Sequence, residues 1–207
     1  MGDRSGGAPQ KSFDVAGLML KGVAVLVAVI IGLSLSLAMF SETDPRGGAF
    51  DLVDTAGASV DEEILEDQIS LVYFGFTYCP DFCPTEIANM AAARRLARAE
   101  GLDPQIVFIA VDPKRDTPEA LREYLDAFDE GLIGLTGAAA QLDAAARAYG
   151  ARFEISPPDS PDDPLGYDVV HTTLVYAVGR DARVFWRFPA MTPPDVIAKK
   201  LKEQAAG

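Results

Sequence analysis

Two cysteines and one histidine are the residues whose types and spacing could bind a metal or exchange electrons. Cys79 and Cys83 are the only cysteines, and three residues separate them. His171, the only histidine, follows much later in the chain. Thiolates and imidazoles bind thiophilic metals such as Cu(I), and closely spaced cysteines also form redox-active pairs. These residues alone therefore leave two chemistries open, metal binding and thiol–disulfide exchange.

Two features of the cysteine pair bear on which metal or reaction it suits: the spacing of the two residues and the helix expected after them. Cys83 would lie in the first turn of a helix that begins near Pro84. A helix N-terminus stabilises negative charge, so we expect this thiol to ionise more readily than a free one. Three residues between the cysteines let both sulfurs turn toward one external point while still permitting a disulfide. With His171 as third donor the set suits Cu(I), whereas a structural zinc site normally has four protein ligands.

Segments with the apolar pattern of strands alternate along the chain with segments that have the pattern of helices, which predicts an α/β fold. Continuous apolar runs rich in β-branched and aromatic residues predict buried strands, and Ala-rich runs with apolar residues at helical spacing predict helices. Thr117 and Pro118 are expected to begin one helix as its N-cap and first residue. The expected strands are 49–54, 59–60, 69–76, 106–111, 132–136, 153–155, 172–178 and 184–188, and the expected helices are 85–100, 117–128, 138–149 and 192–201.

The order of these elements predicts a thioredoxin-like fold with an extra N-terminal β-hairpin. A hairpin, three strand–helix pairs and a terminal hairpin with a helix follow one another. In that fold the first strand–helix junction carries the reactive pair, which is where Cys79 and Cys83 fall. The facing loop holds a proline in thioredoxins, and this chain has His171 there instead. The alternative for His171 is a neutral, hydrogen-bonded histidine at the start of a strand.

Composition and charge limit the partners that the protein can have. The 207 residues are 49% hydrophobic, enough for one packed domain plus an appendage without a metal or a disulfide needed for folding. The formal net charge of −13 repels polyanions, so we expect no nucleic-acid partner. Two cysteines are too few for a disulfide scaffold, so the pair is expected to do redox or metal chemistry.

A nearly uncharged run close to the N-terminus predicts a transmembrane anchor. Residues 18–40 contain one charged residue, Lys21, and match the roughly 20 residues that a helix needs to cross a bilayer. A cleaved signal peptide is the alternative, although its apolar region usually has about 7–15 residues. Residues 1–17 are expected to be a disordered tail, 41–48 a linker, and 49–207 the thioredoxin-like domain with the metal site.

The basic residues around this run predict its orientation. Arg4, Lys11 and Lys21 precede or begin the run, and Arg46 is the only basic residue for a long way after it. Basic residues favour the inner side of a membrane. The expectation is a single-pass protein of the inner, cytoplasmic membrane with its folded domain in the periplasm, or in the intermembrane space if the protein is mitochondrial.

Four blocks of sequence resemble the Sco/SenC family of copper-delivery proteins. The blocks are residues 74–86, 111–118, 134–137 and 167–172, and the resemblance covers about residues 48–203. It implies a membrane-anchored metallochaperone that delivers copper to the dinuclear copper site of cytochrome c oxidase subunit II, or to another apo-cuproprotein. A copper-donating chaperone is a further implied partner. By the same resemblance the copper ligands are Cys79, Cys83 and His171.

A second function stays open, and one position departs from the family pattern. A thiol–disulfide oxidoreductase that reduces the cysteines of the target would need Cys79 and Cys83 as its redox pair, but not His171. That role would make the protein an enzyme. A peroxide-reducing or redox-signalling thioredoxin relative is a remoter alternative, and the lack of an obvious peroxidatic cysteine motif argues against it. Many relatives have an aspartate immediately before the histidine, where this chain has Val170, and Asp168 is the nearby carboxylate that could substitute. The departure bears on the identity of the partner more than on the ligand set.

The acidic and basic residues of the second block have two interpretations. Asp112, Arg115 and Asp116 lie in a loop before the helix that Thr117 is expected to cap. Loop and cap roles are the plain interpretation. The functional alternative is that these residues shape the metal loop or a docking surface.

Overall fold

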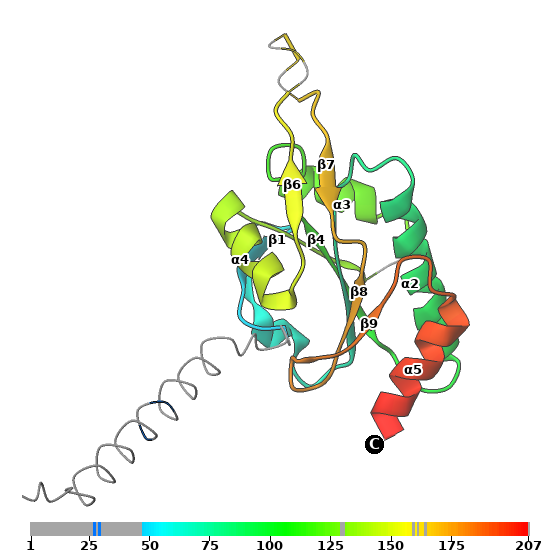
Figure 1. The fold of residues 1–207 in the computed structure, drawn as a ribbon. Coiled ribbons are helices and arrows are strands. Elements are labelled where there is room, and N and C mark those ends of the chain that lie inside the picture. Colours follow the sequence, from blue (N-terminus) through cyan, green and yellow to red (C-terminus); the bar gives the residue numbers. More distant parts are fainter. Residues whose placement is uncertain are drawn as a thin grey trace, which may run out of the picture. The chain divides into compact units, whose positions relative to one another are not determined.

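A mixed β-sheet lies at the centre of the fold (Figure 1). The structure, a computed structural model, describes residues 27, 29, 47–128, 131–158, 160, 162–163 and 165–206. The strands of the sheet are β1 (Asp51–Asp54), β2 (Ser59–Asp61), β3 (Ser70–Gly75), β4 (Gln105–Ala110), β5 (Ile133–Thr136), β8 (Val175–Val178) and β9 (Val184–Phe188), and their spatial order is β2-β1-β5-β4-β3-β8-β9. A separate ribbon consists of β6 (Phe153–Ile155) and β7 (Val169–His171). The helices are η1 (Glu62–Leu65), α2 (Phe82–Arg98), α3 (Pro118–Leu125), α4 (Ala139–Tyr149) and α5 (Pro194–Ala206).

The two central strands form the rigid base from which the cysteine segment leaves. β3 and β4 run parallel, with Val72 opposite Val107 and Gly75 opposite Ala110. Every residue of both strands is buried. This burial on both faces explains why the two strands are continuous apolar runs rather than alternating ones.

Helices cover both faces of the sheet. Tyr73 and Phe74 are consecutive in β3, so their side chains point to opposite faces. The Tyr73 hydroxyl contacts Cys83 of α2, whereas the Phe74 ring packs edge-on against Tyr149 of α4. Helices α2 and α4 therefore lie on opposite faces, and α5 packs beside α2 (Figure 1).

Most of the predicted elements are present, and the mixed α/β architecture is consistent with a thioredoxin-like fold. The N-terminal hairpin is confirmed, since β1 and β2 pair antiparallel with Leu52 opposite Val60. Thr117 caps α3 as predicted, because its hydroxyl accepts a hydrogen bond from the Ala120 amide at 3.3 Å. This helix ends at Leu125, earlier than the predicted Phe128.

The sequence prediction was wrong about the segment that carries the histidine. A single strand was expected over 172–178, whereas β8 covers only Val175–Val178. His171 instead ends β7, which pairs with β6 so that His171 lies opposite Phe153. Strands of three residues give too short an apolar pattern to separate such a ribbon from a loop.

The predicted membrane anchor lies outside the described residues, apart from Val27 and Val29. Both of these residues have helical backbone conformation. Within the described part of the chain, no helix combines the length and the apolar character that crossing a bilayer requires. The predicted tail at 1–17 also lies outside the described residues, as does the linker except for Gly47 and Gly48.

Candidate metal centre

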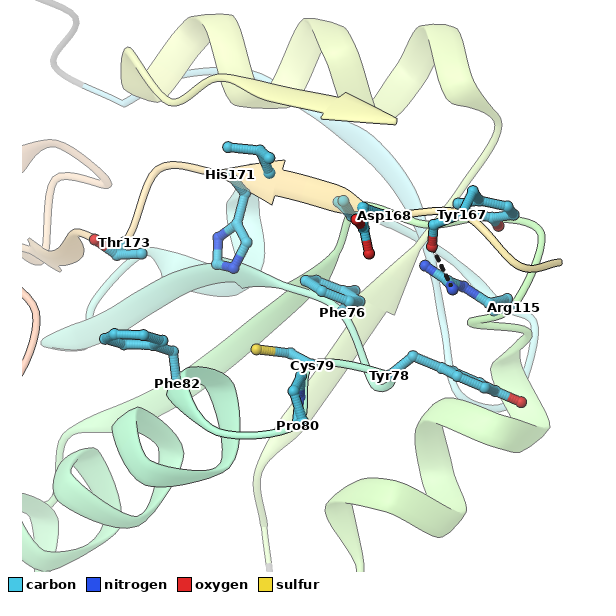
Figure 2. Close-up of a pocket in the computed structure, with 12 residues that line it drawn as sticks. Phe76, Tyr78, Cys79, Pro80, Phe82, Arg115, Tyr167, Asp168, His171 and Thr173 are labelled. Atoms are coloured by element: carbon cyan, nitrogen blue, oxygen red, sulfur yellow. Dashed lines mark hydrogen bonds between the residues drawn. The ribbon is translucent and has the colours of Figure 1, made fainter. Parts of the chain in front are cut away.

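Cys79, Cys83 and His171 lie together beside the end of β3. One potential ligand atom of each residue can be chosen so that all three lie within 4.8 Å of one another. The cysteines come from the segment between β3 and α2, and the histidine comes from the ribbon. Figure 2 shows the Cys79 sulfur and the His171 ring directed into the same space. The fold thus brings together the three residues that the sequence singled out.

The start of α2 orients the two sulfurs. The Cys79 amide donates to the Phe76 carbonyl at 3.3 Å and closes a turn after β3. The helix then begins at Phe82, earlier than the predicted Thr85, so Cys83 lies in its first turn. There the Cys83 amide donates to Cys79 Sγ at 3.4 Å. A helix leaves its first amides without partners inside the helix, and here one of them holds the Cys79 sulfur in place.

Burial reverses the expected ionisation of Cys83. Its side chain is fully buried, and the Tyr73 hydroxyl donates toward its sulfur at 3.9 Å. Loss of hydration raises the pKa of Cys83 to about 12, although a hydrogen bond from the Phe76 backbone acts in the opposite direction. The prediction of an easily ionised thiol was therefore wrong, because the cost of burying a thiolate exceeds the effect of the helix N-terminus. A metal must displace a proton from this thiol when it binds.

Hydrogen bonding and ring packing fix the orientation of the His171 imidazole. Nδ1 lies 3.0 Å from the Thr172 carbonyl oxygen, which can only accept, so Nδ1 carries the hydrogen in this bond. Nε2 then presents its lone pair toward Cys83 Sγ, 3.5 Å away. The rings of Tyr73 and Phe76 pack edge-on against the imidazole, with centroids 5.9 and 5.7 Å away. Burial lowers the pKa of His171, which favours the neutral imidazole that binds metals.

The Thr172 carbonyl takes the orienting position that a carboxylate could have filled. Val170, where the family resemblance leads us to expect an aspartate, is 72% exposed. Asp168 lines the cleft, but the histidine Nδ1 bonds to the backbone. A backbone carbonyl fixes the tautomer of a ligating histidine as well as a carboxylate does. The substitution at Val170 therefore does not leave the imidazole without an orienting partner.

Cys79 and His171 open onto a cleft of about 550 Å³. Both of these residues are partly exposed, whereas Cys83 is fully buried and does not line the cleft. Tyr78 and Phe82 on the rim are 63% and 51% exposed. The residues that line the cleft are Phe76, Tyr78, Cys79, Pro80, Phe82, Arg115, Tyr167, Asp168, Val169, Val170, His171 and Thr173 (Figure 2). A bound ion would therefore be reached from the side of Cys79 and His171.

Two tyrosines contribute to the site without having been singled out from the sequence. Tyr73 contacts Cys83, and Tyr167 bonds the buried Asp112 carboxylate at 2.6 Å. Tyr73 lies in a wholly apolar run and looked like ordinary core. Tyr167 stands in the block around His171, which was the only signal that could have identified it.

The donor set fits a copper ion. Two sulfurs and one imidazole nitrogen are the soft and borderline ligands that Cu(I) prefers, and Cu(I) accepts three of them. Metal–sulfur bonds of about 2.3 Å, as in zinc sites, would place three donors about 4 Å apart around one ion. The observed separations of up to 4.8 Å need only small side-chain adjustments to reach this arrangement.

Comparison with known proteins relates the chain to one family of sequences. The SCO1/SenC family model matches residues 39–206. Protein SenC of Rhodobacter capsulatus is 38% identical over 165 residues, which cover 72% of this chain and 73% of that protein. The human mitochondrial SCO1 homolog is 37% identical over 139 residues, which cover 65% of this chain and 44% of that longer protein.

Solved structures agree with this relationship. Copper-bound ScoI of Arabidopsis thaliana matches with a TM-score of 0.71 and 31% identity, over 78% of this chain and 98% of that one. Copper-bound yeast Sco1 matches with a TM-score of 0.73 and 30% identity, over 78% and 89% of the two chains. Because the family model covers most of the chain and these relatives share both fold and sequence, the protein belongs to the SCO1/SenC family.

Proposed function

We propose that the protein is a copper metallochaperone whose cargo is held by Cys79, Cys83 and His171. The observation that carries the proposal is the convergence of two sulfurs and one imidazole nitrogen within 4.8 Å of one another. Copper in the related Arabidopsis and yeast structures supports the choice of metal. The neutral imidazole supplies a ligand without losing a proton, and the buried Cys83 thiol releases one when copper enters.

The cleft supports transfer of copper to another protein. Cys79 and His171 are partly exposed, so an incoming donor atom can attack the ion from their side and replace them in turn. Exposed Tyr78, Phe82 and Val170 provide an apolar rim of the kind that protein interfaces bury. Ligand exchange across such an interface releases the cargo without free copper.

We infer that the recipient is the dinuclear copper site of cytochrome c oxidase subunit II, by the family resemblance. Another apo-cuproprotein is the alternative recipient, and a copper-donating chaperone would load the site. We also propose that residues 18–40 anchor the chain in the inner membrane, with residues 49–207 forming the copper-binding domain outside it. The nearly uncharged run and the basic residues before it support this arrangement.

One thiol of the pair is partly exposed and the other is buried, which favours a second candidate function, thiol–disulfide exchange. Cys79 is partly exposed and could attack a target disulfide as a thiolate, forming a mixed disulfide and releasing one target thiol. Cys83 behind it would then attack Cys79 Sγ, release the second target thiol and leave a Cys79–Cys83 disulfide. Two electrons and two protons pass to the target, so the pair needs a reductant before it can act again.

Cu(I) binding by the full-length protein in detergent tests the first function. Reduced protein is titrated anaerobically against a Cu(I) chelator, and wild type is compared with His171→Ala. We expect one-to-one binding that weakens by about tenfold or more in the variant, equivalent to about 1.4 kcal/mol. Thr173→Ala, which alters the same cleft without removing a sulfur or imidazole donor, is the control and should bind like wild type.

Equal binding by wild type and His171→Ala would remove the histidine from the site. The cysteines would then be treated as a redox pair, and their reduction potential would be measured. Reduction of a target disulfide by His171→Ala at the wild-type rate would favour the second function, because that chemistry needs only Cys79 and Cys83.

A further inference from the structure

The loop between β4 and α3 contacts both segments that carry the donor atoms. We propose that Asp112, Arg115 and Asp116, together called the clamp, hold the His171 and Cys79 segments at binding distance before copper arrives. The inference rests on the proposed copper site and deepens it. In this role the clamp positions the ligands, and none of its side chains contacts the metal.

Arg115 and Asp112 hold the segment that leads to His171. Arg115 Nη1 donates to the Tyr167 carbonyl at 3.0 Å (Figure 2). It also donates to the Leu165 carbonyl at 3.3 Å. The guanidinium also lies over the Tyr167 ring, 4.0 Å from its centroid. The Tyr167 hydroxyl donates to Asp112 Oδ1 at 2.6 Å, and Asp112 Oδ2 pairs with Arg115 Nε. The backbone carbonyl and the side chain of Tyr167 are thus both bound to the loop, just before β7 begins.

Asp116 holds the segment that leads to Cys79. Its carboxylate accepts the Thr77 amide at 3.2 Å and the Thr77 hydroxyl at 2.5 Å. Thr77 lies two residues before Cys79 in the turn that leaves β3. Arg115 reaches the same segment, since its guanidinium lies 4.9 Å from the centroid of the Tyr78 ring. One short loop therefore contacts the supports of two different ligands.

Burial of the clamp argues against a purely local loop role. Asp112 and Asp116 are fully buried, and the side chain of Arg115 is 6% exposed. Buried charges cost free energy unless they are paired and hydrogen-bonded. The turn itself is already closed by backbone hydrogen bonds to the Asp112 carbonyl, and Thr117 caps the helix. The charged side chains are instead directed at the two ligand segments.

The ribbon that carries His171 packs its Val169 side chain on the core but, among the described residues, receives no strand pairing from the main sheet. β7 pairs with β6 over three residues, and within the described part of the chain neither strand joins the main sheet. An isolated two-stranded pair is marginally stable in water. The clamp supplies hydrogen bonds and a stacking contact at the N-terminal side of β7 that the ribbon lacks.

Cu(I) affinities in a double-mutant cycle test the clamp. With the full-length protein and a competing chelator, Arg115→Gln is expected to weaken Cu(I) binding by about tenfold or more. In the His171→Ala background the same substitution should change the affinity by less than about threefold, because Arg115 acts mainly through His171. An undiminished effect in that background would overturn the proposal.

Asp116→Asn is tested in the same two backgrounds, and here the effect on Cu(I) affinity is expected to persist without His171. Asp116 holds the Cys79 side, so its loss should weaken binding in wild type and in His171→Ala alike. Disappearance of the Asp116→Asn effect in the His171→Ala background would show that the two halves of the clamp do not act on separate ligands, which contradicts the proposal.

Arg94→Gln is the matched control for loss of a buried arginine. The side chain of Arg94 is 10% exposed, pairs with Asp103 and donates to the Gly131 carbonyl. Its removal is expected to lower stability while leaving the Cu(I) affinity unchanged. If Arg94→Gln weakens copper binding as much as Arg115→Gln does, general destabilisation explains both results and the proposal fails.

A measurement on the metal-free protein tests the positioning role of the clamp independently of the proposed copper-binding function. His171 is the only histidine, so a ¹⁵N-labelled sample gives one set of imidazole signals. In the reduced, metal-free protein these signals should report the Nδ1–H tautomer that the Thr172 carbonyl fixes. Arg115→Gln should shift them toward the tautomer mixture of a free imidazole, whereas Arg94→Gln should not. An unchanged tautomer in Arg115→Gln would overturn the proposal.

These outcomes distinguish two kinds of failure. If His171→Ala binds copper normally while the tautomer depends on Arg115, the ligand set is wrong and the positioning role stands. If Arg115→Gln fails to fold, Tyr167→Phe takes its place, because it removes only the hydroxyl bond to Asp112. Tyr167→Phe should weaken Cu(I) binding and perturb the tautomer, and wild-type values for both would overturn the proposal.

Discussion

His171 Nε2 lies 3.5 Å from Cys83 Sγ although 88 positions separate the two residues in the chain. The thiol comes from the first turn of α2, and the imidazole comes from the end of β7. The Thr172 carbonyl fixes the other ring nitrogen, so the sole histidine presents its lone pair to the buried sulfur. A thiol sulfur and an imidazole nitrogen from distant parts of the chain therefore lie in contact at one end of the sheet.

Gly75 is expected to be required for the position of the Cys83 sulfur. A Cβ at Gly75 would lie 3.0 Å from Cys83 Sγ and 2.8 Å from the Phe108 ring. Overpacking of this kind costs about 1–3 kcal/mol. Gly75→Ala should therefore lower the free energy of unfolding and also weaken Cu(I) binding, measured by urea denaturation and chelator competition.

Gly134→Ala is the control for the effect of overpacking alone. A Cβ at Gly134 in β5 would lie 2.6 Å from Leu125 and 2.9 Å from Leu121, away from the three donors. We expect a comparable loss of stability with unchanged Cu(I) affinity. Equal losses of affinity in both variants would contradict a specific role for Gly75.

The two cysteines should differ in their reaction with an alkylating reagent. Cys83 is fully buried, and burial raises its pKa to about 12, whereas Cys79 is partly exposed. Because the thiolate is the reactive form, Cys83→Ser, which leaves Cys79, should react with iodoacetamide at least about tenfold faster at pH 8 than Cys79→Ser, which leaves Cys83. Mass spectrometry of the reduced, metal-free proteins measures both rates.

Unfolding the same variants provides the control for this difference. In concentrated denaturant both thiols are solvated, so the two rates should become similar. A difference that survives unfolding would show that local sequence rather than burial sets the reactivity. Similar rates in the folded proteins would contradict the buried position of Cys83.

Glu86 is expected to make stability depend on pH. The side chain is buried in α2, and burial raises the pKa of Glu86 against hydrogen bonds from the Met191 amide and Asn89. A raised folded-state pKa gives stability that is present below the unfolded value of about 4.3 and is lost as pH rises through the folded value. Glu86→Gln should therefore be more stable than wild type at pH 7.5 and nearly equal to it at pH 4.5, measured by urea denaturation.

Asp103→Asn should show the opposite sign and serves as the comparison. Hydrogen bonds from Arg98 and Arg94 lower the pKa of Asp103 to about 2. The stability from this group is present above the unfolded value of about 3.9 and is lost only as pH falls toward the folded value. Asp103→Asn should be destabilised to a similar extent at pH 7.5 and 4.5. A Glu86→Gln difference that is also constant over this range would contradict the raised pKa of Glu86.

Local patterns in the sequence were sufficient for most elements of the fold. The apolar runs predicted β3 and β4 because strands buried on both faces need apolar residues throughout. Thr117 and Pro118 predicted the start of α3 because capping depends on adjacent residues. The strand at 153–155 was predicted and is β6, but β7 and its pairing with β6 were missed because the three residues of β7 are too few to show a period.

The sequence by itself determined which side chains could form the candidate site. Cys79, Cys83 and His171 are the only residues of their types, and the order of strands and helices was enough to predict that they would converge. Residue type fixes donor chemistry, so these inferences needed no coordinates. The copper-binding family could be identified from the same residues and the blocks around them.

Only the tertiary structure decided the electrostatic state of the site and what supports it. The helix N-terminus predicted an ionised Cys83, but complete burial raises its pKa instead. The contacts of loop residues Asp112 and Arg115 with Tyr167 could not be foreseen from the sequence. Desolvation and long-range hydrogen bonds depend on what surrounds a group in space, and the neighbours of these groups come from distant parts of the chain.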